Sequence, residues 1–422
     1  MGSHSRFSPS ATEREYTCPP SFLLNEQEPD RQSPDAAHGT AAHHVAELCL
    51  RLGHDVEVYA GCVIAVDPKG RCRFTHEKAP LEEDVELGFE VDDEMVLSVQ
   101  EYVDRCRVLP GEHFTEIRVD HTEWCPDLDE FGDPLGPQKG TADHIACVRA
   151  GEVGHDEATI YVTDLKYGMG VKVFAFENKQ AVKYALGAWK EYNWLYNFKR
   201  VVIRIAQPRL DHFDEWALTI DELLSWGEKI KKRLELVFVE DTPFVPTEKG
   251  CKFCKVAYKC KALHDHLGSI YAMQFDELTG EPEHDPRLLT EDQIMKAYSA
   301  APLYDIAAKA VEREVFRRLA NGEPAGRKKL VAAHTRRSWK DEAAARDFLR
   351  SKGVDDSKIV SKVFASPAQA EKHLPRALWD ELAAFYERPP GRPCIVDEAD
   401  PRPPYRNNAH LDHFDLDDGF PE

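Results

Sequence analysis

The chain of 422 residues lacks any long apolar run. No stretch approaches the roughly 20 consecutive apolar residues that a membrane-spanning helix needs, so no such helix is expected. The first residues, MGSHSRFSPSATERE, contain no apolar core of the kind that a secretory signal carries. A phosphate-binding G-x-x-x-x-G-K-[ST] motif is also missing, which argues against an ATPase of that class. These absences predict a soluble, cytoplasmic protein with no membrane partner.

Basic residues are also scarce, because 54 Lys and Arg stand against 75 Asp and Glu, for a net charge of −21. This balance argues against diffuse binding of nucleic acid over the whole surface, but it leaves room for a local basic track. One such run lies between residues 313 and 340 and includes Arg327, Lys328, Lys329, Arg336 and Arg337. The run is interpreted either as a track of phosphate contacts or as a solvated helix face, which is the commoner origin of charge runs.

The 11 cysteines are an odd number and are scattered, so a disulfide framework is not expected in an intracellular chain. Three of them, Cys251, Cys254 and Cys260, follow the spacing C-x2-C-x5-C. A C-x2-C pair in an intracellular chain is typical of a metal site. A fourth ligand is then needed, for which His264 and His266 are the nearest downstream candidates, and the alternative is three loop thiols without metal.

Hydrophobic periodicity predicts a defined order of helices and strands. The expected elements are, in chain order, a helix over 36–53, two strands within 56–75, a helix over 81–106, strands at 114–119, 140–149 and 158–166, a helix over 177–198, a strand at 201–206 and a helix near 219–238. This order predicts an α/β fold in which helices flank a mixed central sheet.

Composition divides the chain into five segments. They are an N-terminal segment at 1–30 that carries Cys18, a main domain at 31–270 closed by the cysteine set, a linker at 271–289, a mostly helical C-terminal region at 290–388, and a disordered acidic tail at 389–422. The tail is rich in proline and aspartate and cannot bury a core. Its Phe414 and Phe420 lie among aspartates, which is typical either of a solubilising end or of a recruitment peptide.

A carboxylate and a lysine, Asp164 and Lys166, lie two residues apart in a predicted strand and therefore share one face of it. Asp143 on the preceding predicted strand can bring a second carboxylate to the same place. Two carboxylates hold Mg²⁺ or Mn²⁺, which activates water, while a lysine orients that water or stabilises a developing oxyanion. An isolated D-x-K match is usually only a surface ion pair.

Two further sets of side chains accompany this pair. Gln180 and Tyr184 are spaced i, i+4, so they share one face of the helix that follows the D-x-K strand. His43 and Glu47 share one face of the first long helix. Alone, these residues would be interpreted as a packed tyrosine, a solvated glutamine and a structural histidine.

The segments GTAAH (39–43), GTAD (140–143), VTDLK (162–166) and QAVKY (180–184) occur in this order. Together they resemble the RecB-like branch of the PD-(D/E)XK nuclease superfamily. The resemblance implies a restriction-endonuclease-like core with His43, Asp143 and Asp164 as Mg²⁺ or Mn²⁺ ligands and Lys166 as the catalytic lysine. It also implies that Gln180 and Tyr184 steady the lysine and contact a DNA strand. Asp164 stands where glutamate is commoner.

The cysteines extend this resemblance to the iron–sulfur members of the branch, the AddB-type nucleases and the CRISPR adaptation nucleases. There, one cysteine before the core joins three after it. The resemblance therefore implies a [4Fe–4S] cluster, with structural Zn²⁺ as the alternative, held by Cys18, Cys251, Cys254 and Cys260.

The whole chain also resembles the phage-borne domain-of-unknown-function family 2800. The likeness lies in residues 8–21 (SPSATEREYTCPPS), 337–342 (RSWKDE) and 400–406 (DPRPPYR). It implies a phage-encoded protein with a role in DNA replication or recombination in a bacterial host. Together with the nuclease resemblance, this favours an exonuclease that acts at DNA ends. The acidic tail would then recruit a phage single-stranded-DNA-binding, annealing or replication protein. The alternative is a catalytically idle DNA-binding or recruitment subunit.

Overall fold

The structure is a computed structural model, which describes residues 5–29, 33–75, 87–127, 131, 135–271, 288–332, 338–354, 367, 370–371, 374–387 and 393–404. Contacts divide the chain into two compact units, and the division falls between Glu312 and Arg313, within helix α9 (Glu291–Ala320). Among the residues that the structure describes, no helix is both long enough and apolar enough to cross a membrane.

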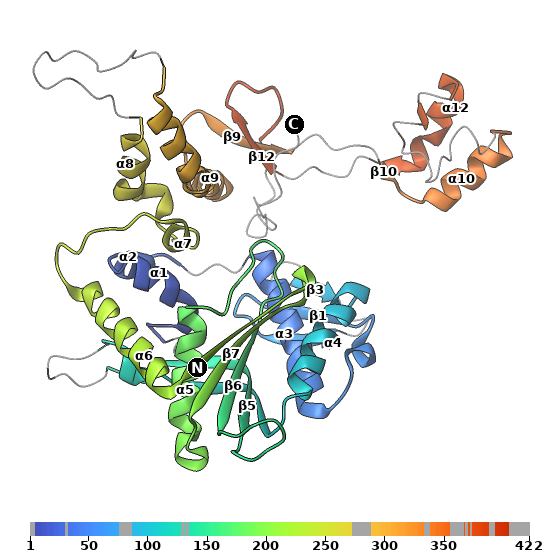
Figure 1. Ribbon diagram of the computed structural model, residues 1–422. Coiled ribbons are helices and arrows are strands. Elements are labelled where there is room, and N and C mark those ends of the chain that lie inside the picture. Colours follow the sequence, from blue (N-terminus) through green and yellow to red (C-terminus); the bar gives the residue numbers. More distant parts are fainter. Residues whose placement is uncertain are drawn as a thin grey trace, which may run out of the picture. The chain divides into compact units, whose positions relative to one another are not determined.

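The first unit is built on a mixed sheet (Figure 1). Its strands are, in spatial order, β4 (Glu112–Asp120), β5 (Lys139–Val148), β6 (Thr159–Leu165), β7 (Arg200–Gln207) and β8 (His212–Thr219). Neighbouring strands are antiparallel except β6 and β7, which are parallel because helix α5 (Lys179–Tyr196) forms the crossover between them. The predicted mixed sheet is confirmed, whereas the edge strand β8 was not predicted.

Helices α5 and α6 (Ile220–Glu235) cover one face of the sheet and bury Leu186 and Ile203 in the main hydrophobic core. Gly187 lets α5 approach β4 closely, since a Cβ there would lie 2.8 Å from the Cβ of Val119. The N-terminal elements η1 (Pro9–Ala11), α1 (Thr12–Thr17) and α2 (Ser21–Glu26) join this core through Phe7, which stacks on Phe22.

The opposite face carries a second hydrophobic core. It is formed by α3 (Pro34–Leu52), η2 (Val56–Tyr59), α4 (Asp93–Arg107) and a small sheet of β1 (Val63–Val66), β2 (Cys72–Thr75) and β3 (Leu87–Glu90), which pack against Leu165 and Ala206. The helix expected over 81–106 begins only at Asp93, because the Asp92 side chain caps it by accepting a hydrogen bond from the Met95 N–H. Strand β3 takes the preceding residues, and 81–86 lie outside the described part.

The remainder of the first unit is a string of short elements and helices. After η5 (Leu236–Phe238) come α7 (Glu248–Cys251), η6 (Ala257–Lys259), α8 (Lys261–Ser269) and the first part of α9. Leu303 of α9 packs with Leu263 and Leu267 of α8, and the Tyr304 hydroxyl donates to the Leu267 carbonyl at 2.7 Å. The first unit therefore extends beyond the expected linker at 271–289, most of which lies outside the described residues.

The second unit mixes helices with short strands. It contains β9 (Lys328–Ala332), β10 (Ser338–Trp339), α10 (Glu342–Ser351), α12 (Arg376–Glu381), η8 (Leu382–Ala384), β11 (Tyr386–Glu387) and β12 (Pro393–Asp397). Strand β12 lies in the segment 389–422, for which the sequence predicts disorder, and it pairs with β9. That prediction is wrong for β12, because Ile395 and Val396 find partner backbone in β9. Phe414 and Phe420 lie outside the described residues.

Candidate metal site and cysteine cluster

The end of β6 and the start of α5 bring the predicted D-x-K residues and helix residues together. The Lys166 ammonium lies 2.7 Å from Asp164 Oδ2 and donates to Gln180 Oε1 at 3.1 Å. The Gln180 amide in turn donates to the Tyr184 hydroxyl at 3.4 Å. The strand spacing i, i+2 and the helix spacing i, i+4 therefore meet in one chain of polar contacts, as the sequence predicts.

Asp143 on β5 joins this group from the neighbouring strand. Its Oδ2 accepts a hydrogen bond from the Leu165 N–H at 2.7 Å, and its Oδ1 lies 3.4 Å from His43 Nδ1 on α3. Burial alone would raise the pKa of Asp143, but His43, Lys166 and the Leu165 N–H outweigh burial and lower it. Asp143 is therefore held as a carboxylate between the histidine and the D-x-K strand.

Glu116 is a candidate ligand that the sequence analysis did not select. The β4–β5 ladder pairs Thr115 with His144 and Ile117 with Ala142, so Glu116 lies opposite Asp143, and no pairing forms between these two. Glu116 adopts a left-handed backbone conformation with φ of 51°, which is costly for a residue other than glycine. Its Oε1 lies 3.9 Å from His43 Nδ1.

His43, Glu116 and Asp143 form a group whose ligand atoms all lie within 4.8 Å of one another. The two carboxylates raise the pKa of His43 to about 10, against the lowering effect of burial. Because a ligating histidine must be neutral, a cation bound here would displace that proton. The group differs from the predicted ligand set in containing Glu116 in place of Asp164.

Asp164 remains a candidate ligand because its carboxylate is buried near Asp143. Its Oδ2 is paired with the Lys166 ammonium at 2.7 Å. Burial raises the pKa of Asp164, Lys166 opposes this, and Asp143 adds to it. A buried carboxylate near Asp143 fits the oxygen ligands that Mg²⁺ and Mn²⁺ prefer.

The structure brings Cys18 together with the three distant cysteines. Cys18 follows α1, Cys251 ends α7, and all four thiols line one cavity with Val245, whose N–H donates to Cys18 Sγ at 3.4 Å. Burial, together with the other three cysteines, raises the pKa of Cys251 to about 11. The histidine alternatives do not line this cavity in the part of the chain that the structure describes.

The side chain of Asn25 on α2 is buried and contacts this cluster. Its Oδ1 accepts from Arg14 at 3.2 Å and from the Lys255 N–H at 2.8 Å. Because both partners are donors only, the amide nitrogen must point the other way, where it donates to Cys254 Sγ at 3.3 Å and to the Ser21 carbonyl at 2.7 Å. All four hydrogen-bonding positions of Asn25 are used.

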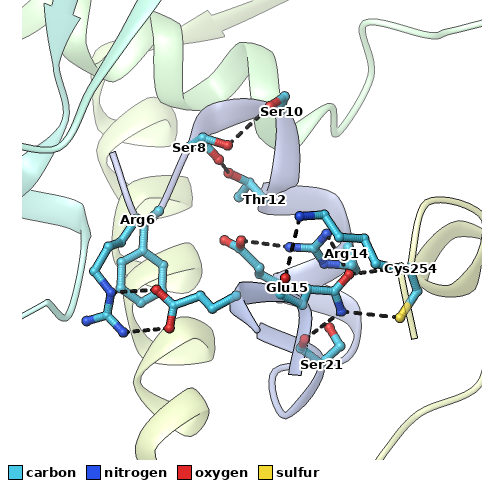
Figure 2. A network of polar contacts seen from close by, with 12 residues as sticks. Arg6, Ser8, Ser10, Thr12, Arg14, Glu15, Ser21 and Cys254 are labelled. Atoms are coloured by element: carbon cyan, nitrogen blue, oxygen red, sulfur yellow. Dashed lines mark hydrogen bonds and ion pairs between the residues drawn. The ribbon is translucent and has the colours of Figure 1, made fainter. Parts of the chain in front are cut away.

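A buried polar network continues from Asn25 into the sheet core. Arg14 also donates to the buried carboxyl group of Glu15 (Figure 2). Burial raises the pKa of Glu15 to about 7, although Lys183 and Arg14 lower it. Lys183 of α5 is itself fully buried and donates to the Phe7 carbonyl at 3.1 Å. The N-terminal segment is thus connected to both the cysteine cluster and the central helix.

The predicted basic track is only partly described. Lys329 donates to the Asp400 carbonyl at 2.7 Å, and Arg327 lies 3.8 Å from Glu398, so these side chains contact the segment after β12. Lys328 lies beside them at the start of β9. Arg336 and Arg337 lie outside the described residues, and the role of the whole run in DNA binding stays a prediction.

Comparison with known proteins gives a structural likeness and a family. The crystal structure of SSO0001 aligns with 40% of this chain and 71% of its own, at 15% sequence identity and a TM-score of 0.24. The profile of the family described as "Protein of unknown function (DUF2800)" matches residues 4–403, which is nearly the whole chain. The chain belongs to the DUF2800 family.

Proposed function

We propose that this protein is a metal-dependent DNA nuclease of the PD-(D/E)XK type, in the RecB-like branch. The observation that carries the proposal is the convergence of Asp143 and Asp164, from adjacent strands, with His43 and Lys166 around one point. A structural ion pair needs neither a second buried carboxylate nor an imidazole beside it. Hydrolysis of a phosphodiester needs both a cation site and a nearby positive charge.

His43, Glu116, Asp143 and Asp164 are the residues that would hold Mg²⁺ or Mn²⁺. The bound cation would supply an activated water and offset the charge that develops on the phosphate. Gln180 and Asp164 both contact the Lys166 ammonium and hold it beside the proposed metal ligands. Burial raises the pKa of Tyr184, so its hydroxyl stays protonated while it accepts from Gln180.

The cysteine cavity fits an iron–sulfur cluster better than zinc. A tetrahedral Zn²⁺ with Zn–S bonds of about 2.3 Å needs sulfurs about 3.8 Å apart. Among the described residues, His43, Glu116 and Asp143 have ligand atoms that all lie within 4.8 Å of one another. In that part of the chain, no three of the cysteine sulfurs meet this limit, so they are spaced more widely than a zinc site requires. A [4Fe–4S] cluster needs the wider spacing, because its irons and sulfides fill the space between the thiolates. Structural Zn²⁺ is the alternative outcome of a metal analysis.

The biological role is part of the proposal and rests on the family resemblance. The protein would be phage-encoded, act in the bacterial cytoplasm, and degrade DNA from its ends during replication or recombination. The acidic tail would recruit a phage single-stranded-DNA-binding, annealing or replication protein. Arg327 and Lys328 would contribute phosphate contacts, so reversing their charge would weaken binding and flatten its salt dependence.

The direct test uses end-labelled linear and circular DNA, single- and double-stranded, with Mg²⁺ or Mn²⁺. Wild-type protein and an Asp156→Asn control, which changes an exposed carboxylate in a turn, should cleave linear DNA. Lys166→Ala should lose cleavage by a factor of at least about 100, since it removes the charge beside the reacting phosphate. Cleavage by Lys166→Ala at the wild-type rate would place the active site elsewhere. Binding without cleavage by the wild type would favour the idle-subunit alternative.

A further inference from the structure

A loop that is rooted in the candidate metal site follows β6. It leaves the site just after Lys166 and returns to it at Gln180, and these two side chains hydrogen-bond to each other at 3.1 Å. Both ends of the loop are therefore anchored at the candidate metal site. Met169 lies three residues from Lys166, which limits their Cα separation to about 11 Å.

Buried and half-buried polar side chains of β7 and β8 hold the backbone of this loop. The Gln207 amide donates to the Gly168 and Val171 carbonyls at 2.8 Å, and its oxygen accepts from the Val173 N–H at 3.1 Å. Asp214 accepts from the Ala175 N–H at 2.8 Å. The His212 ring contacts the Val173 carbonyl at 2.8 Å. These five hydrogen bonds from side chains outside the loop fix its backbone.

Despite this anchoring, the loop presents large apolar side chains to solvent. Phe174 is 56% exposed and Phe176 is 66% exposed, and Met169 and Val171 are each about half exposed. Ala175 between the two phenylalanines is fully buried, so the backbone points the small residue inward and the aromatic rings outward. Four exposed apolar side chains within eight residues cannot be explained by core packing.

The exposed rings extend into a wider aromatic surface on β8. Phe174 contacts the His212 ring edge-on at 5.0 Å, and Phe176 contacts the Trp216 ring edge-on at 5.4 Å between centroids. Lys172 is also exposed on the same loop and adds a positive charge. Aromatic faces with a cation close to a phosphate site are what unpaired nucleotides bind: bases stack on the rings and the phosphates meet the charge.

We propose that the loop at 167–178 is a stacking surface for unpaired nucleobases, which receives the strand next to the bond to be cut. The inference rests on the proposed nuclease function and names its substrate class as single-stranded DNA or a frayed DNA end. A docked protein would also cover apolar side chains, but Phe176 is four residues from Gln180, which limits their Cα separation to about 14 Å and keeps the occupant of the loop near the metal site. Duplex DNA hides its base faces and would gain little from the rings.

The test measures DNA binding without cleavage, in EDTA, for Phe174→Ala/Phe176→Ala. A single-stranded oligonucleotide with 2-aminopurine reports base stacking through its fluorescence, and anisotropy reports affinity. The control is Trp194→Ala, which removes another aromatic ring that is 82% exposed, roughly 21 Å from Gln180 along α5. The double variant should bind single-stranded DNA at least about fivefold more weakly, lose the 2-aminopurine quenching, and bind blunt duplex as the wild type does.

The outcomes separate this inference from the proposed function. Unchanged single-strand affinity and quenching in the double variant would overturn the stacking surface, even if Lys166→Ala abolishes cleavage. Loss of quenching in the double variant, together with normal cleavage by Lys166→Ala, would support the surface and refute the assigned active site. Equal losses for duplex and single strands, or losses shared by Trp194→Ala, would also overturn the inference.

Discussion

Replacing Asp164 with asparagine should abolish metal binding without unfolding the protein. The substitution keeps the size of the side chain but removes a charge that burial and Asp143 both disfavour. It also removes the ion pair with Lys166, but that side chain is a quarter exposed and keeps its hydrogen bond to Gln180, so the lost pair is offset by removal of the buried negative charge. The metal-free variant should therefore melt within about 2 °C of the metal-free wild type.

The expected effect of metal can be worked out from the size of the first unit. A cation at 100 times its Kd adds about 2.7 kcal/mol to the stability of the state that binds it. The unit spans Met1–Glu312, and roughly 300 residues unfold with an entropy of about 0.6 kcal/mol/K. Wild-type protein should therefore gain about 4 °C in its unfolding midpoint with Mn²⁺ or Mg²⁺, and Asp164→Asn should gain much less.

Differential scanning fluorimetry in EDTA, Mg²⁺ and Mn²⁺ measures both quantities on the same samples, at one fixed heating rate. Asp156→Asn is the matched control, because it removes an exposed carboxylate and should keep the full metal shift. An equal metal shift in the wild type and in Asp164→Asn would refute the reasoning, since Asp164 could then not be a ligand. If neither cation changes the unfolding midpoint of the wild type, the proposed metal site is refuted.

Three further substitutions test the cysteine cluster and the buried polar network beside it. Cys18→Ser should lose bound iron and melt at a lower temperature. The control Cys49→Ser, which changes a buried thiol of α3, should keep its iron. Full iron content in Cys18→Ser would show that Cys18 is not a ligand. Asn25→Asp keeps the acceptor for Arg14 but replaces the N–H that faces Cys254, so redox titration should show the cluster reduced at a lower potential; an unchanged potential would contradict the N–H···S contact. Glu15 keeps its proton in the folded protein up to a pH of about 7, so its contribution to stability is full below about pH 4.5 and is lost as the pH rises to about 7. Glu15→Gln should remove about 2 kcal/mol of that pH dependence between urea titrations at pH 5.5 and 7.5, and an unchanged pH dependence would show that Glu15 titrates normally.

Local patterns in the sequence predict much of the candidate site. The side chains of a strand alternate, so Asp164 and Lys166 had to share a face, and the helix spacing had to place Gln180 and Tyr184 together. The same periodicities predict most of the central elements. Strand β8 escaped prediction because its residues are mostly half-buried or exposed, so its hydrophobic alternation is weak.

Short-range periodicity encodes the local partners in the site, whereas long-range packing selects the distant residues that join them. Glu116 enters the site only because the register of β4 against β5 sets it opposite Asp143, and no local pattern encodes a register between strands. Cys18 could be assigned from the sequence only through a family resemblance, since its approach to Cys254 depends on how α1 and α2 pack. The exposure of Phe174 and Phe176 depends on Gln207 and Asp214, which anchor their loop from other strands. Contacts of this kind arise from long-range packing, which short-range periodicity does not contain.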